Sequence, residues 1–258
     1  MEDLIKNMSN TNIIMSSILF TCGHDGYLNP GDIQKRNLSN LDSICDKRQF
    51  ETIRDLYTSE ITTGIAWNIY LLTSQQSQPP TVIEKYHRKY MDVNRKLPCA
   101  YEDQEAEFYY YEYHGLISKY LKEMYYKNKE ENLMSYLFDI HGYNRTETDQ
   151  ADIILGTENG KTVWKLLKNH PDAINDLIIM LREKNYNVFH ATVTSVNPDL
   201  DGGYTINHYS NKAWRYACNA IQFEFADELR TNIDKRTKLT VDLSKSIFEF
   251  VSKYSKNV

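Results

Sequence analysis

Residues 13–26 read IIMSSILFTCGHDG, an apolar run that ends in a histidine between two glycines. The run Ile13–Cys22 has the length and composition of a short buried strand. The glycines around His24 permit a sharp turn that exposes the imidazole at the strand tip. Ile13–Phe20 is far shorter than the roughly 20 residues that span a bilayer. It also lacks a small-residue cleavage site after a basic flank, so we expect neither a membrane anchor nor a signal peptide.

The same arrangement, polar residues directly after an apolar run, recurs twice along the chain. Asn94 and Arg95 follow the expected strand Tyr90–Val93, and His141 follows Tyr136–Ile140. In open α/β sheets, binding sites gather at the carboxyl ends of strands, where the loops converge on one crevice. Two histidines and an arginine at such ends predict a metal ion with an anion clamp beside it.

Strands and helices alternate along the rest of the sequence. The expected helices cover residues 48–72, 104–127, 162–168, 172–184 and 242–254, and the further strands cover 81–83, 153–155, 188–193 and 220–225. In the first helix, Phe50, Ile53, Leu56, Tyr57, Ile61 and Ile65 form the apolar face, and Asp55 lies off it. This alternation predicts a single-domain, three-layer α/β/α fold with a mixed, largely parallel central sheet, of the phosphorylase/hydrolase-like kind.

The composition of the 258 residues, 41% hydrophobic and 25% charged with a net charge of -5, is that of a globular protein and argues against a nucleic-acid partner. The four cysteines form no CxxC pair, which disfavours a zinc knuckle or a redox pair. Scattered thiols without an export signal indicate a reducing, cytoplasmic location. Cys22, close to His24, is an alternative candidate for a nucleophile.

His24 and His141 together fit zinc, which takes imidazole readily and usually has three protein ligands when it is catalytic. The position three residues after His24, where an acidic partner would be expected, is Tyr27. Asp25 is adjacent to His24 and geometrically awkward. The candidates for the third ligand are therefore Asp55 and Glu60.

Glu224 lies inside the apolar run Ile221–Phe225. One interpretation makes it the solvent-facing position of an alternating strand. The other makes it a buried carboxylate whose pKa desolvation raises towards the working range of a general base. Its spacing in the sequence does not separate the two.

Seven separated segments, in order over residues 18 to 230, resemble the N-formylglutamate amidohydrolases, relatives of the zinc carboxypeptidases and aspartoacylases. They are Cys22–Gly26 with Pro30, Arg54–Tyr57, Tyr90–Arg95, Phe138–His141, Gly156-Thr157 with Gly160, Gly202–Ile206 with His208-Tyr209, and Ala220–Glu224. Each segment is a weak match alone, and their common order makes the resemblance specific.

The resemblance implies a role for each matched residue. His24, Asp55 and His141 would be zinc ligands, Asp139 would orient a metal histidine, and Glu224 would be the general base. Asn94 and Arg95 would grip the carboxylate of the substrate, a task that suits the planar fork of arginine. Thr157 and His208 are expected on the substrate side, and His114 is expected either there or in the packing.

One departure from the family pattern bears on the substrate. Gly142 follows His141 where the family usually has serine, and Arg145 comes shortly after. Arg145 could hold a second carboxylate or polarise the scissile carbonyl, or it could form a surface salt bridge.

The sequence thus predicts a zinc-dependent amidohydrolase acting on a small molecule or short peptide with a free carboxylate, such as N-formylglutamate. Rival interpretations are a carboxypeptidase-like or cell-wall peptide amidase, and a non-catalytic binding protein on the same fold. The absence of an acidic residue three positions after His24 motivates the interpretation as a binding protein. Neither a nucleic acid nor a membrane is expected as a partner.

Overall fold

The computed structural model describes residues 17–47, 50–76, 78–146, 150–191 and 200–256. In these residues six strands form one sheet in the order β2-β1-β3-β6-β4-β5. Their bounds are β1 Ile18–Cys22, β2 Thr81–Ile83, β3 Tyr136–Tyr143, β4 Ile153–Gly156, β5 Val188–His190 and β6 Asn219–Ala226. β4 pairs with β6 antiparallel and with β5 parallel, while the other neighbours are parallel, so β4 and β5 run against the rest.

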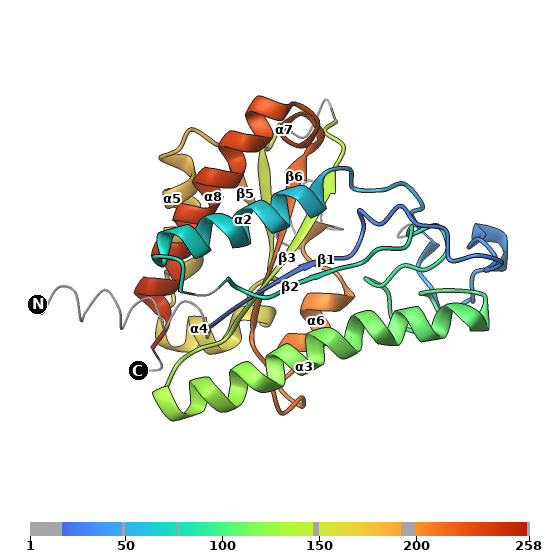
Figure 1. Cartoon of the computed structure of the whole chain (residues 1–258), viewed down its shortest axis with the longest axis horizontal. Helices are drawn as coiled ribbons and strands as arrows, with labels where there is room; N and C mark the ends of the chain where they lie inside the picture. Colours follow the sequence, from blue (N-terminus) through green and yellow to red (C-terminus); the bar gives the residue numbers. More distant parts are fainter. Residues whose placement is uncertain (1–16, 48–49, 77, 147–149, 192–199, 257–258) are drawn as a thin grey trace, which may run out of the picture.

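Helices cover both faces of this sheet (Figure 1). The α-helices are α2 Thr58–Leu72, α3 Glu107–Glu131, α4 Trp164–Asn169, α5 Ala173–Arg182, α6 Tyr204–Ser210, α7 Asp227–Thr231 and α8 Ile233–Tyr254. Short 3₁₀ turns occupy Leu38–Asn40, Gln104–Ala106 and Lys161–Val163. α2, α5 and α8 lie on one face, and α3 and α6 lie on the other. The three-layer α/β/α fold with a mixed, largely parallel sheet is confirmed.

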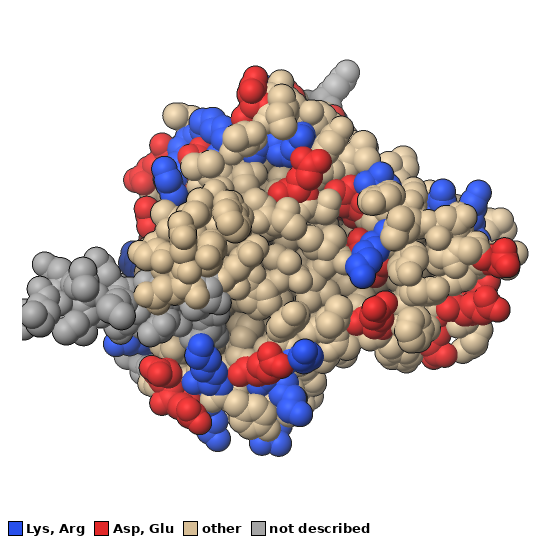
Figure 2. All heavy atoms as spheres, in the orientation of Figure 1, with Lys and Arg blue, Asp and Glu red and all other residues tan. Residues whose placement is uncertain are grey.

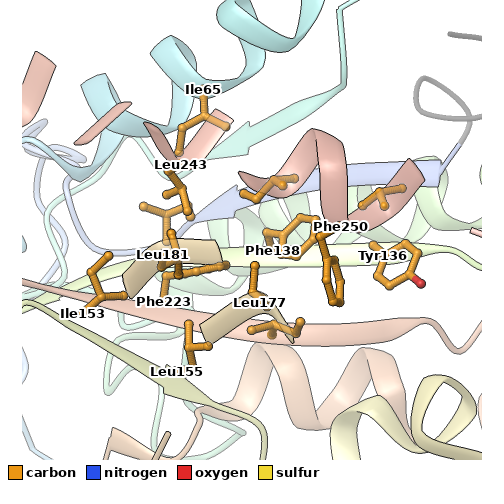
Figure 3. Close-up of a cluster of buried hydrophobic side chains, with 14 of the residues drawn as sticks. Ile65, Tyr136, Phe138, Ile153, Leu155, Leu177, Leu181, Phe223, Leu243 and Phe250 are labelled. Carbon is orange, nitrogen blue, oxygen red and sulfur yellow. The ribbon is translucent and has the colours of Figure 1, made fainter. Parts of the chain in front are cut away.

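Side-chain alternation along the strands divides the core into two layers. Phe138 of β3 and Phe223 of β6 point to the α2, α5 and α8 face, where they join Leu177 and Leu243 (Figure 3). Leu137 and its neighbours in the sheet point to the opposite face, under α3 and α6. On this second face, the residues of β3 and β6 nearer the carboxyl ends of the strands are polar. They are Asp139, His141, Gln222 and Glu224, and their side chains form the site.

The expected helix over 48–72 is wrong in its first part, because α2 begins only at Thr58. Tyr57, the residue before it, has a left-handed backbone with a φ of 68°. Ile53 and Leu56 have helical spacing but are 63% and 41% exposed. Asp55 therefore lies in the loop that leads into α2 and not on the helix; residues 48–49 lie outside the described part.

Residues 90–93 form a buried turn and not the expected strand. The amide of Asp92 donates to the carbonyl of Ala100 at 2.8 Å, and the amide of Arg95 donates to the carbonyl of Asp92 at 3.1 Å. The short helices α6 and α7 were not predicted, and α8 begins at Ile233 and not at 242. The expected strand residues 13–16 and 192–193 lie outside the described residues.

The cysteines do not form the expected set of free thiols. Cys45 and Cys99, 54 residues apart, form a disulfide, while Cys22 and Cys218 are free and buried. Because disulfides persist mainly in oxidising environments, the cysteines no longer support the expected reducing compartment. Burial raises the pKa of Cys22 to about 12, which disfavours the thiolate that a nucleophile needs.

Figure 2 shows acidic and basic side chains interspersed on one face of the molecule. Among the described residues, no helix combines the length and the apolar character needed to cross a membrane.

Candidate metal centre and active site

The register of β3 and β6 places the reactive side chains next to one another. Asp139 and His141 alternate onto the same face of β3, and Gln222 and Glu224 do so on β6. Because the two strands are parallel and in register, Asp139 lies beside Gln222 and His141 beside Glu224. All four side chains are buried.

His24, Asp55 and His141 converge on one point. Oδ2 of Asp55 lies 3.3 Å from Nδ1 of His24 and 3.3 Å from Nδ1 of His141. One potential ligand atom from each residue falls within 4.8 Å of the other two, and all three residues are buried. His24 comes from the loop after β1, Asp55 from the loop before α2, and His141 from β3. This is the donor set that a catalytic zinc site takes.

The far side of each imidazole is held by a second carboxylate. Nε2 of His24 donates to Oδ1 of Asp92 at 2.7 Å, and Nε2 of His141 donates to Oδ2 of Asp139 at 2.9 Å. With Nε2 engaged in this way, Nδ1 of each ring faces the common point. Carboxylate–histidine pairs of this kind usually orient the ligands of a metal ion, so the residues present fit one.

Electrostatics at this point favour positive charge. Burial alone would lower the pKa of His141, but the carboxylates of Asp139 and Asp55 raise it well above the ordinary value. Burial alone would raise the pKa of Asp55, but His24, His141 and Arg88 lower it. A divalent cation supplies positive charge of the kind that this cluster stabilises.

Asp92 is a fully buried carboxylate that links the metal cluster to two arginines. Its Oδ2 lies 2.7 Å from Nη2 of Arg88 and 3.6 Å from Nη1 of Arg36. Arg88 also reaches Oδ1 of Asp55 at 3.3 Å. Burial would raise the pKa of Asp92, but Arg88 and His24 hold it well below the ordinary value. The carboxylate behind His24 is thus kept ionised.

Glu224 is buried and turned towards the cluster, which excludes the solvent-facing interpretation. Burial raises its pKa to about 7; His141 opposes this shift, and Asp55 and Asp139 reinforce it. Nε2 of Gln222 donates to Oε1 of Glu224 at 2.8 Å, which fixes the carboxyl group. A carboxylate with a pKa near neutrality can both accept and return a proton.

A cavity of about 730 Å³ opens in front of these residues. His24, Asp55, His141 and Glu224 all line it, together with Arg36, Arg54, Arg88, Asn94, Arg95, Lys96, Gly203, Tyr204, Asn207, Gln222 and Arg230. Ile44, Cys45, Phe50, Ile53 and Cys99 also line it. Cavities of this size accommodate small molecules and short peptides.

Asn94 and Arg95 both line this cavity. Oδ1 of Asn94 accepts the amide of Thr205 at 2.8 Å, and Nη1 of Arg95 donates to the carbonyl of Asn94 at 2.8 Å. A Cβ at Gly203 would lie 2.1 Å from Nδ2 of Asn94, so only glycine leaves room for this amide. The side chain of Arg95 is half-buried at the cavity wall.

Two alternatives for the third ligand are engaged elsewhere. Asp25 pairs with Arg54 at 2.7 Å and accepts the amide of Ser59 in the first turn of α2. Glu60 is on the exposed side of α2 and pairs with Arg236 at 3.1 Å. Of the three acids considered from the sequence, Asp55 is the one beside both histidines.

Four other residues singled out in the sequence are not among the described residues that line the cavity. Arg145 pairs with Asp152, which corresponds to the salt-bridge interpretation. Thr157 is buried and lies 2.7 Å from Nε2 of His190, while His208 is exposed beside Tyr204. His114 is buried in the packing, where its Nε2 donates to the carbonyl of Val93 at 3.0 Å.

Sequence reasoning gave no role to Asp92, Arg88, Gln222 or Arg230. Arg88 and Asp92 are four residues apart, a spacing that could have indicated an ion pair. Gln222 is two residues before Glu224 in a strand, so alternation alone places it on the same face. Arg230 gave no signal, because its partners are backbone carbonyls from three distant segments.

Comparison with known proteins identifies related folds. No family model and no curated protein matches the sequence. Among solved structures, N-formylglutamate amidohydrolase from Ralstonia eutropha JMP134 matches with a TM-score of 0.63 and 15% identity, covering 92% of this chain and 93% of its own. A gene product from Agrobacterium tumefaciens matches with a TM-score of 0.62 and 12% identity, covering 95% of this chain and 93% of its own. These similarities establish a shared fold over nearly the whole chain.

Proposed function

We propose that this protein is a zinc-dependent hydrolase that cleaves an amide bond in a small, carboxylate-bearing substrate. The observation that carries the proposal is the convergence of His24, Asp55 and His141 beside Glu224 on one cavity wall. The fold shared with the Ralstonia eutropha N-formylglutamate amidohydrolase supports an N-acyl amino acid as the substrate class.

Zinc held by His24, Asp55 and His141 would lower the pKa of water towards neutrality and polarise the scissile carbonyl. Glu224 accepts the proton released in the attack, because its pKa of about 7 leaves part of the population ionised at neutral pH. The same carboxyl group then returns the proton to the leaving amine. Asp92 and Asp139 keep the two imidazoles in the orientation that presents Nδ1.

Arg95 and Asn94 hold the substrate carboxylate in this proposal. Both line the cavity that contains the metal cluster, and the guanidinium of arginine matches a carboxylate with two parallel hydrogen bonds. Fixing the carboxylate orients the amide towards His141 and Glu224, which lowers the entropic cost of reaction. Arg145 has no part in this mechanism, since it pairs with Asp152 away from the cavity.

The size of the cavity favours a second candidate, a carboxypeptidase-like or cell-wall peptide amidase. About 730 Å³ exceeds what a formylated amino acid fills and suits a short peptide. Comparing amine release from N-formylglutamate and other N-acyl acidic amino acids with cleavage of short peptides separates the two candidates. Higher kcat/KM on peptides would favour the amidase.

The deciding experiment combines metal analysis with matched variants. Purified protein should contain about one zinc per chain, and His141→Ala and Glu224→Gln should each lose amide hydrolysis. Glu224→Gln should keep its zinc, because that side chain is not one of the three ligands. His170→Ala and Glu60→Gln, outside the cavity, are the controls and should retain activity. Full activity in either site variant refutes the mechanism, and a protein that takes up no zinc and cleaves nothing is the non-catalytic binding protein instead.

A further inference from the structure

Arg230, on the short helix α7, is a buried cation at the wall of the active-site cavity. Its guanidinium donates to three backbone carbonyls: Nη1 to Leu56 at 2.8 Å, Nε to Phe225 at 3.0 Å and Nη2 to Tyr143 at 3.1 Å. The planar fork of arginine can satisfy three acceptors from different directions, which the single ammonium group of lysine cannot reproduce.

Each of these carbonyls belongs to a segment that carries a residue of the site. Leu56 follows Asp55, Phe225 follows Glu224, and Tyr143 lies two residues after His141. The three segments are distant in sequence and belong to the loop before α2, to β6 and to β3. One guanidinium therefore connects the backbones that position two ligand candidates and the proposed general base.

The absence of a side chain at Gly142 leaves the space that the guanidinium of Arg230 occupies. A Cβ at position 142 would lie 2.3 Å from Nε and 2.5 Å from Cζ of Arg230, far inside van der Waals contact. The amide of Gly142 donates to Oδ2 of Asp55 at 3.2 Å, so the same residue also contacts a ligand directly. The glycine that follows His141, a departure from the family pattern, is thus explained by the arginine packed against it.

The partners of Arg230 differ from those of the other buried arginines in the cavity. Arg36 and Arg88 combine backbone carbonyls with the carboxylate of Asp92, whereas within the described part of the chain the Arg230 guanidinium donates to three carbonyl oxygens. Carbonyl acceptors fix the position of a backbone, while a carboxylate partner would mainly balance charge. This points to a geometric role.

We propose that Arg230 is a positioning residue, which holds Asp55, His141 and Glu224 in the geometry that the metal and the reaction require, and that Gly142 is its obligatory partner. The inference rests on the proposed function, because the geometry it protects is that of the zinc site. It adds two residues, 142 and 230, to the determinants of that site.

The test measures zinc affinity by competition with a chromophoric chelator, and kcat and KM at saturating zinc. Arg230→Gln, Arg230→Lys and Gly142→Ala should each bind zinc about 10-fold or more weakly, the range seen when residues that orient metal ligands are lost. At saturating zinc, kcat should fall at least as strongly while KM changes less than about twofold, since Arg95 and Asn94 are untouched. Arg182→Gln, which removes an arginine–carbonyl contact to Val188 away from the cavity, is the matched control and should bind zinc as the wild type does.

Coupling between the two positions gives a second criterion. Because Gly142→Ala acts by displacing the Arg230 side chain from Cδ outwards, its effect should vanish once that side chain is truncated, so Gly142→Ala/Arg230→Ala should bind zinc no more weakly than Arg230→Ala alone. Circular dichroism shows which variants are folded at the assay temperature; should Arg230→Ala be unfolded, Arg230→Ser takes its place in this coupling comparison.

Wild-type zinc affinity in folded Arg230 variants, or strictly additive effects of the two positions, overturns the positioning role and leaves the proposed function intact. A wild-type protein that binds no zinc overturns both. The two failures are therefore distinguishable in one set of titrations.

Discussion

Replacing both cysteines of the disulfide, Cys45→Ser/Cys99→Ser, should lower stability by an amount that follows from chain entropy. The bridge joins residues 54 positions apart. A loop of that length gives an unfolded-state entropy loss of about 14 cal/mol/K, or about 4 kcal/mol at 25 °C. With an unfolding entropy of about 2.1 cal/mol/K per residue over the chain, this corresponds to a Tm lower by about 8 °C.

The assay is thermal unfolding followed by circular dichroism, with and without a phosphine reductant. Reductant should lower the Tm of the wild type to that of the double variant and leave the double variant unchanged, although Cys22 and Cys218 are still present in both. Thiol titration of the unfolded, unreduced wild type should find two thiols per chain, those of Cys22 and Cys218. Four reactive thiols, or a Tm insensitive to reductant, would refute the reasoning.

Three further predictions concern the core, a buried acid and the support of a ligand. Ile65→Ala, at a fully buried position of α2, should cost about 2–5 kcal/mol in urea unfolding, whereas Leu71→Ala on the exposed side should cost less than about 1 kcal/mol; equal losses would contradict the burial. Burial raises the pKa of Glu84 from 4.5 to about 7, so the folded state keeps a proton that the unfolded state releases, and stability falls as the pH rises from 4.5 through 7. Glu84→Gln should therefore match the wild type at about pH 4 and exceed its unfolding free energy by about 3 kcal/mol at about pH 8; parallel pH profiles would rule this out. Asp92→Asn should weaken zinc binding about 10–100-fold by releasing the imidazole of its histidine partner, while exposed Asp234→Asn should not; unchanged affinity in both would show that Asp92 is not needed.

The strands that carry His141 and Glu224 could be predicted because residues 136–140 and 220–225 are short apolar runs of the length of a buried strand. In parallel strands, register then brings such ends to the same edge of the sheet. What the spacing of Glu224 could not give was its direction, since either face of a strand is compatible with flanking phenylalanines. The burial of Glu224 on the cavity side decides this.

The prediction that the helix begins at residue 48, before Asp55, was wrong for a physical reason. Phe50 and Ile53 repeat at helical spacing, but they line the cavity and are not part of the hydrophobic core clusters. Apolar side chains at helical spacing can face either the core or a cavity, and the sequence does not distinguish these two cases. The helix starts where the left-handed backbone of Tyr57 ends the loop, a feature that no residue-type pattern indicated.

Asp92 and the disulfide were missed because both depend on long-range pairing. Asp92 lies in a turn whose path is set by a backbone bond to Ala100, and its histidine partner is 68 residues away. Cys45 and Cys99 carry no spacing signal at 54 residues. Contacts of this kind follow only from the assembled sheet and its loops.

The three ligand candidates, His24, Asp55 and His141, lie on chain segments that meet only in the folded protein. A divalent ion bound there would act as a crosslink between the first strand, the loop before α2 and the central strand. Amide hydrogen exchange around these three residues should slow together as the ion is added, and removing it with a chelator should loosen the same segments before the rest of the sheet opens.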